Sequence, residues 1–111
     1  MSKSPNDRLQ GTLDLLILTI LARSGPLHGY AIAKQIRERS DDALRIEDGS
    51  LYPAIYRMAQ EKWVSAKWAV TESNRPARIY KLTALGRKQL HREEDKWAQL
   101  TAAVGRVIQP A

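Results

Sequence analysis

The segment at residues 9–22 constrains the fold most, because it has the periodicity of a helix with two apolar sides. One stripe consists of Leu9, Leu13, Leu16, Ile17 and Ile20, and a second consists of Leu15, Leu18 and Ala22. A helix that is apolar on two sides needs two packing partners. In a chain of 111 residues, one side can cover the internal core and the other is covered most simply by a second copy. The segment therefore predicts one compact core and a homodimer.

The composition bounds the class of protein. A hydrophobic fraction of 43% with 27% charged residues fits an ordinary folded chain. The absence of cysteine excludes a disulfide framework and a thiolate metal site, and it fits a reducing compartment. Asp14 interrupts the apolar run at residues 13–22, and no stretch approaches the roughly 20 apolar residues of a membrane span. We expect a cytoplasmic protein with no membrane segment.

Breaks in the pattern divide the next part of the chain into short elements. Ser24, Gly25 and Pro26 end the first helix, and residues 29–39 have the pattern of a short amphipathic second helix. Residues 44–46 alternate as a minimal strand. A third helix is expected to begin near Ser50, with Pro53 in its first turn, where the missing N–H breaks no helical bond.

Two alternating segments, at residues 63–70 and 77–82, predict a β-hairpin with a basic tip. Thr83 is then expected to cap a long final helix. Apolar residues recur along this helix at heptad positions, which is typical of a dimer seam. The seam residues are Leu90, Trp97, Leu100 and Val104. Glu93 interrupts the seam, so the helix is interpreted as an interface element and not as a long coiled-coil rod.

The order helix, helix, strand, helix, hairpin predicts a winged helix-turn-helix, mainly α with a small β-hairpin. In that fold the third helix can enter the major groove of DNA while the hairpin reaches along the backbone. Residues 8–83 are expected to form the DNA-binding domain and residues 84–108 the C-terminal dimerisation helix. The formal charge of +6 fits a polyanionic partner. Residues 75–92 carry six basic and no acidic residues, although a solvated face would explain this run equally well.

Four motifs make the expectation specific. They are GTLDLLIL at 11–18, GPLHGY at 25–30, GSLYPA at 49–54 and LTALGR at 82–87. Together they resemble the PadR family of transcriptional regulators. The resemblance implies a winged-helix homodimer held by its terminal helices, usually a repressor whose affinity for DNA falls when a small molecule binds. Two departures from the family pattern concern Pro76 in the wing and Lys62, which stands where many members have glycine.

The resemblance also implies roles for single residues. Contacts with double-stranded DNA are implied for Ser50, Tyr52, Pro53, Tyr56 and Arg57 in the third helix, for Asn74, Arg75 and Arg78 in the wing, and for His28 and Tyr30 at the start of the second helix. Side-chain chemistry adds Lys81 as a phosphate contact and Gln60 as a base reader beside Tyr56 and Arg57.

Structural alternatives stand beside several of these roles. For Tyr52 and Tyr56 the alternative is packing beneath the wing, although DNA contact is favoured for Tyr56, and for Arg57 it is a pair with Glu61 one turn on. His28 is expected to cap a helix or to pack, and not to act as a pH switch. His91, Glu94 and Asp95 share one helical face, but three such groups on an exposed helix are usually solvated, so no metal or other cofactor is expected.

The expected dimer interface combines the first helix, through Leu9, Leu13 and Leu16, with the seam of the last helix. Trp97 at a two-fold axis would face its own copy and form a flat slot for a small aromatic effector. Plain interface packing is the favoured explanation for this tryptophan, and the slot is the alternative.

Other function classes are weighed against this one. An enzyme is excluded, because the two histidines are far apart in sequence and there is no glycine-rich phosphate loop and no nucleophile with a base. A winged helix used for protein interaction or for non-specific nucleic-acid binding remains the alternative. Steep salt dependence would separate DNA binding from an apolar protein contact.

Overall fold

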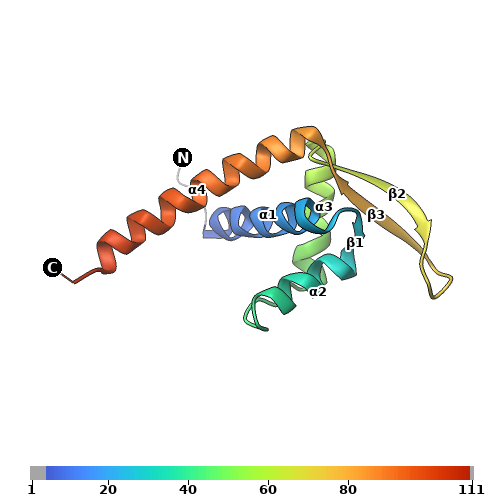
Figure 1. Ribbon diagram of the computed structural model, residues 1–111, viewed down its shortest axis with the longest axis horizontal. Helices are drawn as coiled ribbons and strands as arrows, with labels where there is room; N and C mark the ends of the chain where they lie inside the picture. The colour runs from blue at the N-terminus through green and yellow to red at the C-terminus, as the bar shows by residue number, and fades with distance from the viewer. Residues whose placement is uncertain (1–4, 111) are drawn as a thin grey trace.

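The computed structural model of the protein describes residues 5–110, with side chains described from residue 11 onward. The elements are α1 (Pro5–Ser24), β1 (Leu27–His28), α2 (Gly29–Arg39), α3 (Asp48–Gln60), β2 (Val64–Val70), β3 (Pro76–Leu82) and α4 (Ala84–Ile108). Figure 1 shows the helices gathered around α1, with the β2–β3 hairpin projecting at one end and the C-terminal half of α4 projecting at the other. The mainly helical winged helix-turn-helix with a long last helix confirms the expected fold class.

The core lies where α1, α2 and α3 meet the base of the sheet. Each helix directs its apolar side inward, because the apolar residues recur three and four positions apart. The largest fully buried side chains among the described residues are Ile17 and Leu18 of α1, Ile32 of α2, and Leu51, Ile55 and Met58 of α3. Because Leu51, Ile55 and Met58 are held in the core, the opposite side of α3 faces outward.

The sheet has the strand order β1-β3-β2, and both pairs are antiparallel. The hairpin agrees with the sequence prediction, but the predicted strand at residues 44–46 is wrong. The third strand is β1, which pairs Leu27 with Tyr80 and His28 with Ile79. A strand of two residues exists only because it pairs with a neighbouring strand. Alternation of apolar and polar residues over three positions does not show which strand that neighbour is.

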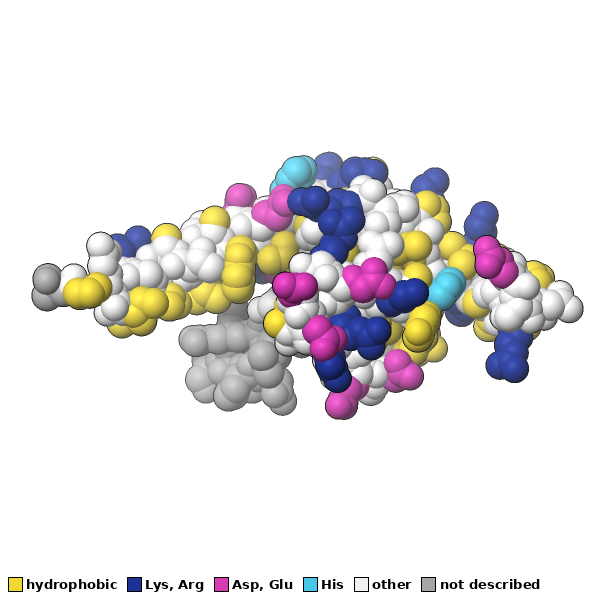
Figure 2. All heavy atoms as spheres, turned by 60° about the horizontal axis from the view of Figure 1, so that its bottom comes forward, with side chains coloured by type: hydrophobic (Ala, Val, Ile, Leu, Met, Phe, Trp, Pro, Cys, Tyr) yellow, Lys and Arg dark blue, Asp and Glu magenta, His cyan; other side chains and the backbone are white. Residues whose placement is uncertain are grey.

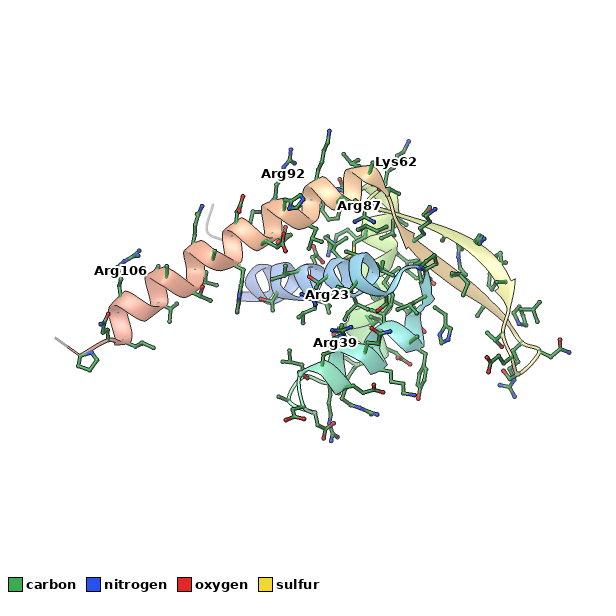
Figure 3. The ribbon with its side chains drawn as sticks, in the orientation of Figure 1. Arg23, Arg39, Lys62, Arg87, Arg92 and Arg106 are labelled. Atoms are coloured by element: carbon green, nitrogen blue, oxygen red, sulfur yellow. The ribbon has the colours of Figure 1, made fainter. Side chains whose placement is uncertain are left out.

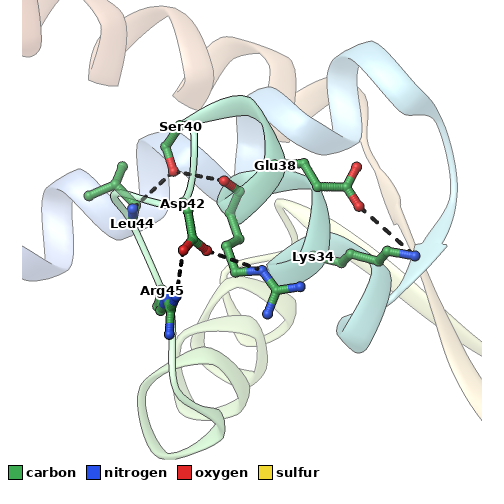
Figure 4. A network of polar contacts seen from close by, with 7 residues as sticks. Lys34, Glu38, Ser40, Asp42, Leu44 and Arg45 are labelled. Atoms are coloured by element: carbon green, nitrogen blue, oxygen red, sulfur yellow. Dashed lines mark hydrogen bonds and ion pairs between the residues drawn. The ribbon is translucent and has the colours of Figure 1, made fainter.

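The segment mispredicted as a strand is instead a loop tied to the end of α2 (Figure 4). The Leu44 backbone N–H donates to the Ser40 hydroxyl at 2.9 Å. Asp42 forms ion pairs with Arg37 and Arg45. These pairs are exposed and each contributes little to stability. The Leu44 N–H, which a strand would have used to pair with a neighbouring strand, is therefore occupied by this bond at the end of α2.

The entry into α4 is fixed by Thr83 and Gly86. The Thr83 hydroxyl accepts the Gly86 N–H at 2.9 Å, as expected of an N-cap, and donates to the Lys62 carbonyl at 2.7 Å. A Cβ on Gly86 would collide with the backbone carbonyl of Trp63. Lys62 has a left-handed backbone conformation, with φ of 65°. The chain thus adopts with lysine the conformation that glycine favours at this position.

The overall dimensions of 58 × 29 × 25 Å reflect the length of α4. Its first half packs on α1, and its second half extends past the body (Figure 1). Within the part of the chain that the structure describes, no helix combines the length and apolar character that crossing a membrane requires.

Candidate nucleic-acid interface

The outward side of α3 carries four of the predicted DNA contacts. Leu51, Ala54, Ile55 and Met58 occupy the buried side of the helix. The exposed side carries Ser50, Pro53, Tyr56 and Gln60. Tyr56 is 56% exposed, so it does not pack beneath the wing as the alternative proposed. The exposed side of α3 is therefore polar and accessible in this chain.

Tyr52 occupies a different environment from Tyr56. Its ring is half-buried and lies over the start of α2, where a Cβ added to Gly29 would be 2.6 Å from the ring. Burial raises the pKa of the Tyr52 hydroxyl, and nearby Asp48 and Tyr56 raise it further. Tyr52 thus packs α3 against α2, and its contact with DNA stays a prediction.

His28 and Tyr30 lie at the beginning of α2. The imidazole Nδ1 of His28 accepts the Ala31 N–H at 3.3 Å, which confirms the expected helix cap. The His28 and Tyr30 rings stack with their centroids 6.2 Å apart. Tyr30 is exposed, so this pair presents an aromatic surface beside α3.

Arg57 has a partner that the sequence did not suggest. Its guanidinium pairs with the carboxylate of Asp14 on α1. The Asp14 side chain is 7% exposed and that of Arg57 is 31% exposed. Desolvation raises the pKa of Asp14, the Arg57 cation opposes that rise, and Glu93 of α4 adds to it. Arg57 therefore ties α3 to α1, and base reading by Arg57 stays a prediction. The signal in the sequence was an acidic residue within an otherwise apolar helix.

The wing, defined as residues 64–82, carries the remaining predicted contacts. Arg75, Arg78 and Lys81 are exposed, and Asn74 turns the tip with φ of 60°. Pro76 starts β3 and pairs with Val70, so it leaves the hairpin register intact. The basic run predicted as one patch divides into two parts, because Arg87 and Arg92 lie on α4 and not on the hairpin (Figure 3).

Sequence reasoning missed Trp68 in the wing. This residue pairs with Arg78 across β2 and β3, and the Arg78 guanidinium carbon is 5.5 Å from the centre of the indole ring. Trp68 lies on the same face of the hairpin as Val64, Tyr80 and Leu82, which are buried in the core, but the wing extends beyond the core and leaves Trp68 66% exposed.

The predicted dimer residues fall into three groups. Leu13 and Leu16 are half-buried and pack against the core, while the side chain of Leu9 lies outside the described residues. Leu90 is 8% exposed and belongs to the core, so it offers little surface to a second copy. This corrects its assignment to the seam, and the cause is that the first half of α4 packs on α1. The exposed seam residues are Trp97, Leu100 and Val104.

Glu93 marks the boundary between the two halves of α4. It is buried, accepts a hydrogen bond from the Gln89 amide at 2.8 Å and pairs with Lys96 at 3.6 Å. Beyond it, residues 97–108 form the part of α4 that we call the arm. Figure 2 shows hydrophobic side chains gathered along one side of the arm.

A pocket of about 490 Å³ opens between α1, α2 and α4. Its apolar lining includes Leu15, Leu16, Ile20, Ile36 and Trp97. Arg23, Arg39 and Glu94 supply charged groups around it. Its volume is within the range of small-molecule sites in proteins.

An exposed polar helix beside a basic hairpin defines the winged-helix class of DNA-binding proteins. The family described as "Transcriptional regulator PadR-like family" matches residues 17–92. The chain belongs to this family and is a DNA-binding transcriptional regulator, not an enzyme. The resemblance inferred from the four motifs is thereby confirmed.

Solved structures agree with this assignment over nearly the whole chain. A transcriptional regulator from Clostridium thermocellum superposes with a TM-score of 0.83 at 24% identity, covering 93% of this chain and 99% of that one. A PadR family regulator from Eggerthella lenta gives a TM-score of 0.76 at 29% identity, covering 96% and 90% of the two chains. An uncharacterized 37.1 kDa transposon protein from Streptomyces fradiae is 38% identical over 97 residues, or 87% of this chain, which spans 25% of that protein's length.

Proposed function

We propose that this regulator is a homodimeric repressor that binds a pseudo-palindromic operator and is released from it by a small-molecule effector. The observation that carries the proposal is the apolar side of the arm, where Trp97, Leu100 and Val104 are each nearly half exposed. Contiguous exposed apolar surface of this kind marks an interaction site. Between residues 97 and 108 the sequence has a single charged residue, Arg106. A second copy of the same arm offers a matching apolar surface.

A two-fold dimer would present two copies of α3 to the DNA. Half-sites about one helical turn, roughly 34–36 Å, apart would then be read together. Tyr56 and Gln60 are the proposed base readers on the exposed side of α3. Arg75, Arg78 and Lys81 would neutralise phosphates beside each half-site. Occupation of such a site at a promoter blocks transcription.

The effector is proposed to bind in the pocket beside Trp97. The pocket joins α4 to α1 and α2, so a ligand there would contact both the dimer arm and the DNA-binding part. An effector releases the operator if it binds more tightly to a dimer whose α3 helices have the wrong separation. The apolar lining and the two arginines suit a small aromatic molecule that carries a negative charge.

The test is a footprint and a salt titration on the DNA upstream of the protein's own gene, with random duplex as competitor. We expect protection of a pseudo-palindrome that survives the competitor, and affinity that falls steeply with salt. Gln60→Ala should relax base preference at one position of each half-site, whereas Glu61→Ala serves as the neighbouring control. Weak binding that is equal on both duplexes would instead support a non-specific or protein-interaction role.

A further inference from the structure

The buried polar side chains of the described residues gather at one place in the helical core. They are Asp14 of α1 and Gln89 and Glu93 of α4. Within the described part of the chain, no buried side-chain nitrogen or oxygen lacks a hydrogen-bond partner. Moving such groups from water to the interior costs free energy unless their partners are well placed. Their grouping where α1 meets α4 is therefore not explained by hydrophobic packing.

Asp14 interacts with charged side chains of two other helices. Its carboxylate accepts a hydrogen bond from the guanidinium of Arg57 on α3. It also lies within electrostatic range of Glu93 and Lys96 on α4. The helix that carries Asp14, α1, packs against both α3 and α4 (Figure 1). Asp14 is therefore a point at which charges of α3 and α4 act on the same group.

Glu93 makes the connection from α4 to α1. One of its carboxylate oxygens, Oε1, accepts the Gln89 amide at 2.8 Å and lies 3.6 Å from the Lys96 ammonium. The other oxygen, Oε2, lies against α1, where a Cβ added to Gly11 would be 3.8 Å from it. Gly11 precedes Asp14 by about one helical turn. Glu93 thus reaches from α4 to the turn of α1 that carries Asp14.

Carboxylates and cations alternate in this cluster, which we call the polar junction and define as Asp14, Arg57, Gln89, Glu93 and Lys96. Desolvation raises the pKa of Asp14, Arg57 opposes the rise, Glu93 adds to it and Lys96 opposes it. Hydrogen bonds between charged groups are directional, whereas the hydrophobic effect is not. The polar junction therefore holds the three helices at more closely defined positions than apolar packing alone.

The helices joined at the polar junction carry the two surfaces of the proposed function. The exposed side of α3 carries the proposed base readers, Tyr56 and Gln60. Directly after Lys96, α4 continues into the arm, which is the proposed dimer surface. In a two-fold dimer held by the arms, the separation of the two α3 helices depends on the angle between α3 and the arm within each copy.

We propose that the polar junction fixes the angle between α3 and the arm, so that Asp14 and Glu93 are positioning residues that set the half-site spacing accepted by the dimer. Neither residue would contact DNA, because both are buried. The proposal rests on the homodimer and the operator binding proposed above.

Distances across the full-length dimer test the proposal without DNA. The chain has no cysteine, so Glu61→Cys, at the exposed C-terminal end of α3, accepts one spin label per copy. Pulsed electron paramagnetic resonance then measures the distribution of distances between the two labels. We expect a narrow distribution with Asp14 in place. Asp14→Asn keeps an acceptor but loses the charge, so the distribution should become broader or move. Asp95→Asn, which removes a charge from the exposed side of α4, should leave it narrow.

Operators with altered spacing test the consequence for DNA binding. One extra base pair between the half-sites lengthens the spacing by about 3.4 Å. The unchanged protein should prefer the natural spacing at least about tenfold, because the longer operator cannot make all contacts of both half-sites. Asp14→Asn and Glu93→Gln should each reduce this preference to about threefold or less. The double variant should lower it by less than about twofold more, because both changes act on one junction.

An apolar replacement separates positioning from stability. Asp14→Leu combined with Arg57→Met should keep the resistance to urea, because apolar side chains of similar volume often replace a buried ion pair without loss. This variant should still have a reduced spacing preference. The proposal is overturned if the variant keeps both the narrow distribution and the preference. It is equally overturned if Asp14→Asn lowers the affinity for both operators by the same factor. Absence of dipolar coupling, or of a protected pseudo-palindrome, with otherwise unchanged protein would overturn the proposed function, and this inference with it.

Discussion

The wing and the arm both project from the body and both expose large apolar side chains, yet they differ in charge. The wing as a whole carries four basic residues and one acidic residue, and one of the basic residues, Arg78, lies over Trp68, whereas the arm carries a single charged residue, Arg106. Apolar exposure alone marks an interaction surface but does not name the partner. We therefore propose DNA as the partner of the wing and a second copy of the chain as the partner of the arm, because of this difference in charge.

The largest expected effect comes from placing charge on the arm. Leu100→Asp combined with Val104→Asp should weaken dimerisation by at least about 100-fold, because carboxylates would be buried without partners. Analytical ultracentrifugation over a concentration series measures the dissociation constant of the dimer. Ala102→Asp, on the opposite side of the same helix, should leave that constant within a few-fold. An unchanged dimer in the double variant would refute the role of the arm.

The second effect concerns Gly86, where the wing meets α4. Gly86→Ala should destabilise the protein by about 3 kcal/mol or more, because the added methyl collides with the Trp63 backbone carbonyl. Gly105→Ala in the arm meets no atom of this chain within 4 Å and should stabilise α4 by about 0.5–1 kcal/mol. Urea unfolding of both variants measures this contrast. Equal stabilities would show that the junction is more adaptable than the structure indicates.

The third effect separates two exposed arginines. Arg75→Gln in the wing should weaken operator binding about tenfold and lower the slope of log affinity against log salt by about 0.9, the value for one phosphate contact. Arg106→Gln in the arm makes the same change in net charge. If both variants lower affinity and slope equally, net charge and not the position of the wing explains DNA binding.

The smallest effect is a pH dependence of the stability of the helical core, from which the wing and the arm both project. Desolvation raises the pKa of Asp14 in the folded protein above its value in the unfolded chain. Folding therefore favours the protonated form, and the contribution of Asp14 to stability falls as pH rises from about 4 through the raised pKa.

Asp14→Asn, which stays neutral and keeps an acceptor for Arg57, should lose this fall. The difference in free energy of unfolding, Asp14→Asn minus the unchanged protein, should thus increase as pH rises from about 4 to 7. Urea titrations across this range measure the difference, and Asp95→Asn controls for the loss of one surface charge. A constant difference across the range would contradict the prediction.

The elements set by local chemistry were predicted well. The apolar periods located all four helices, and the Thr83 and His28 caps were both anticipated. The exposed positions of Tyr56 and Gln60 followed from the helical period of α3. Such features depend on residues within about one turn of each other, which a sequence displays directly.

Features that depend on distant residues were missed. The third strand was placed at residues 44–46 because alternation identifies extended chain but not its partner, and β1 exists through its pairing with β3. Arg57 was assigned to Glu61 or to DNA, while its partner Asp14 lies 43 positions away on α1. Separations of this size become contacts only when the helices pack.

The sequence by itself determined the four helices, the hairpin and the side of α3 that faces outward, because periodicity and capping act over a few residues. Only the tertiary structure decided where the core ends. It assigned Leu90 to the core while leaving Trp97 exposed seven residues later, and it buried Tyr80 while exposing Trp68 on the same face of the wing. The physical reason is that the burial of a side chain depends on which element lies opposite it. A helix or hairpin that extends beyond its neighbouring elements exposes apolar side chains there, although their spacing is the same as in the buried part.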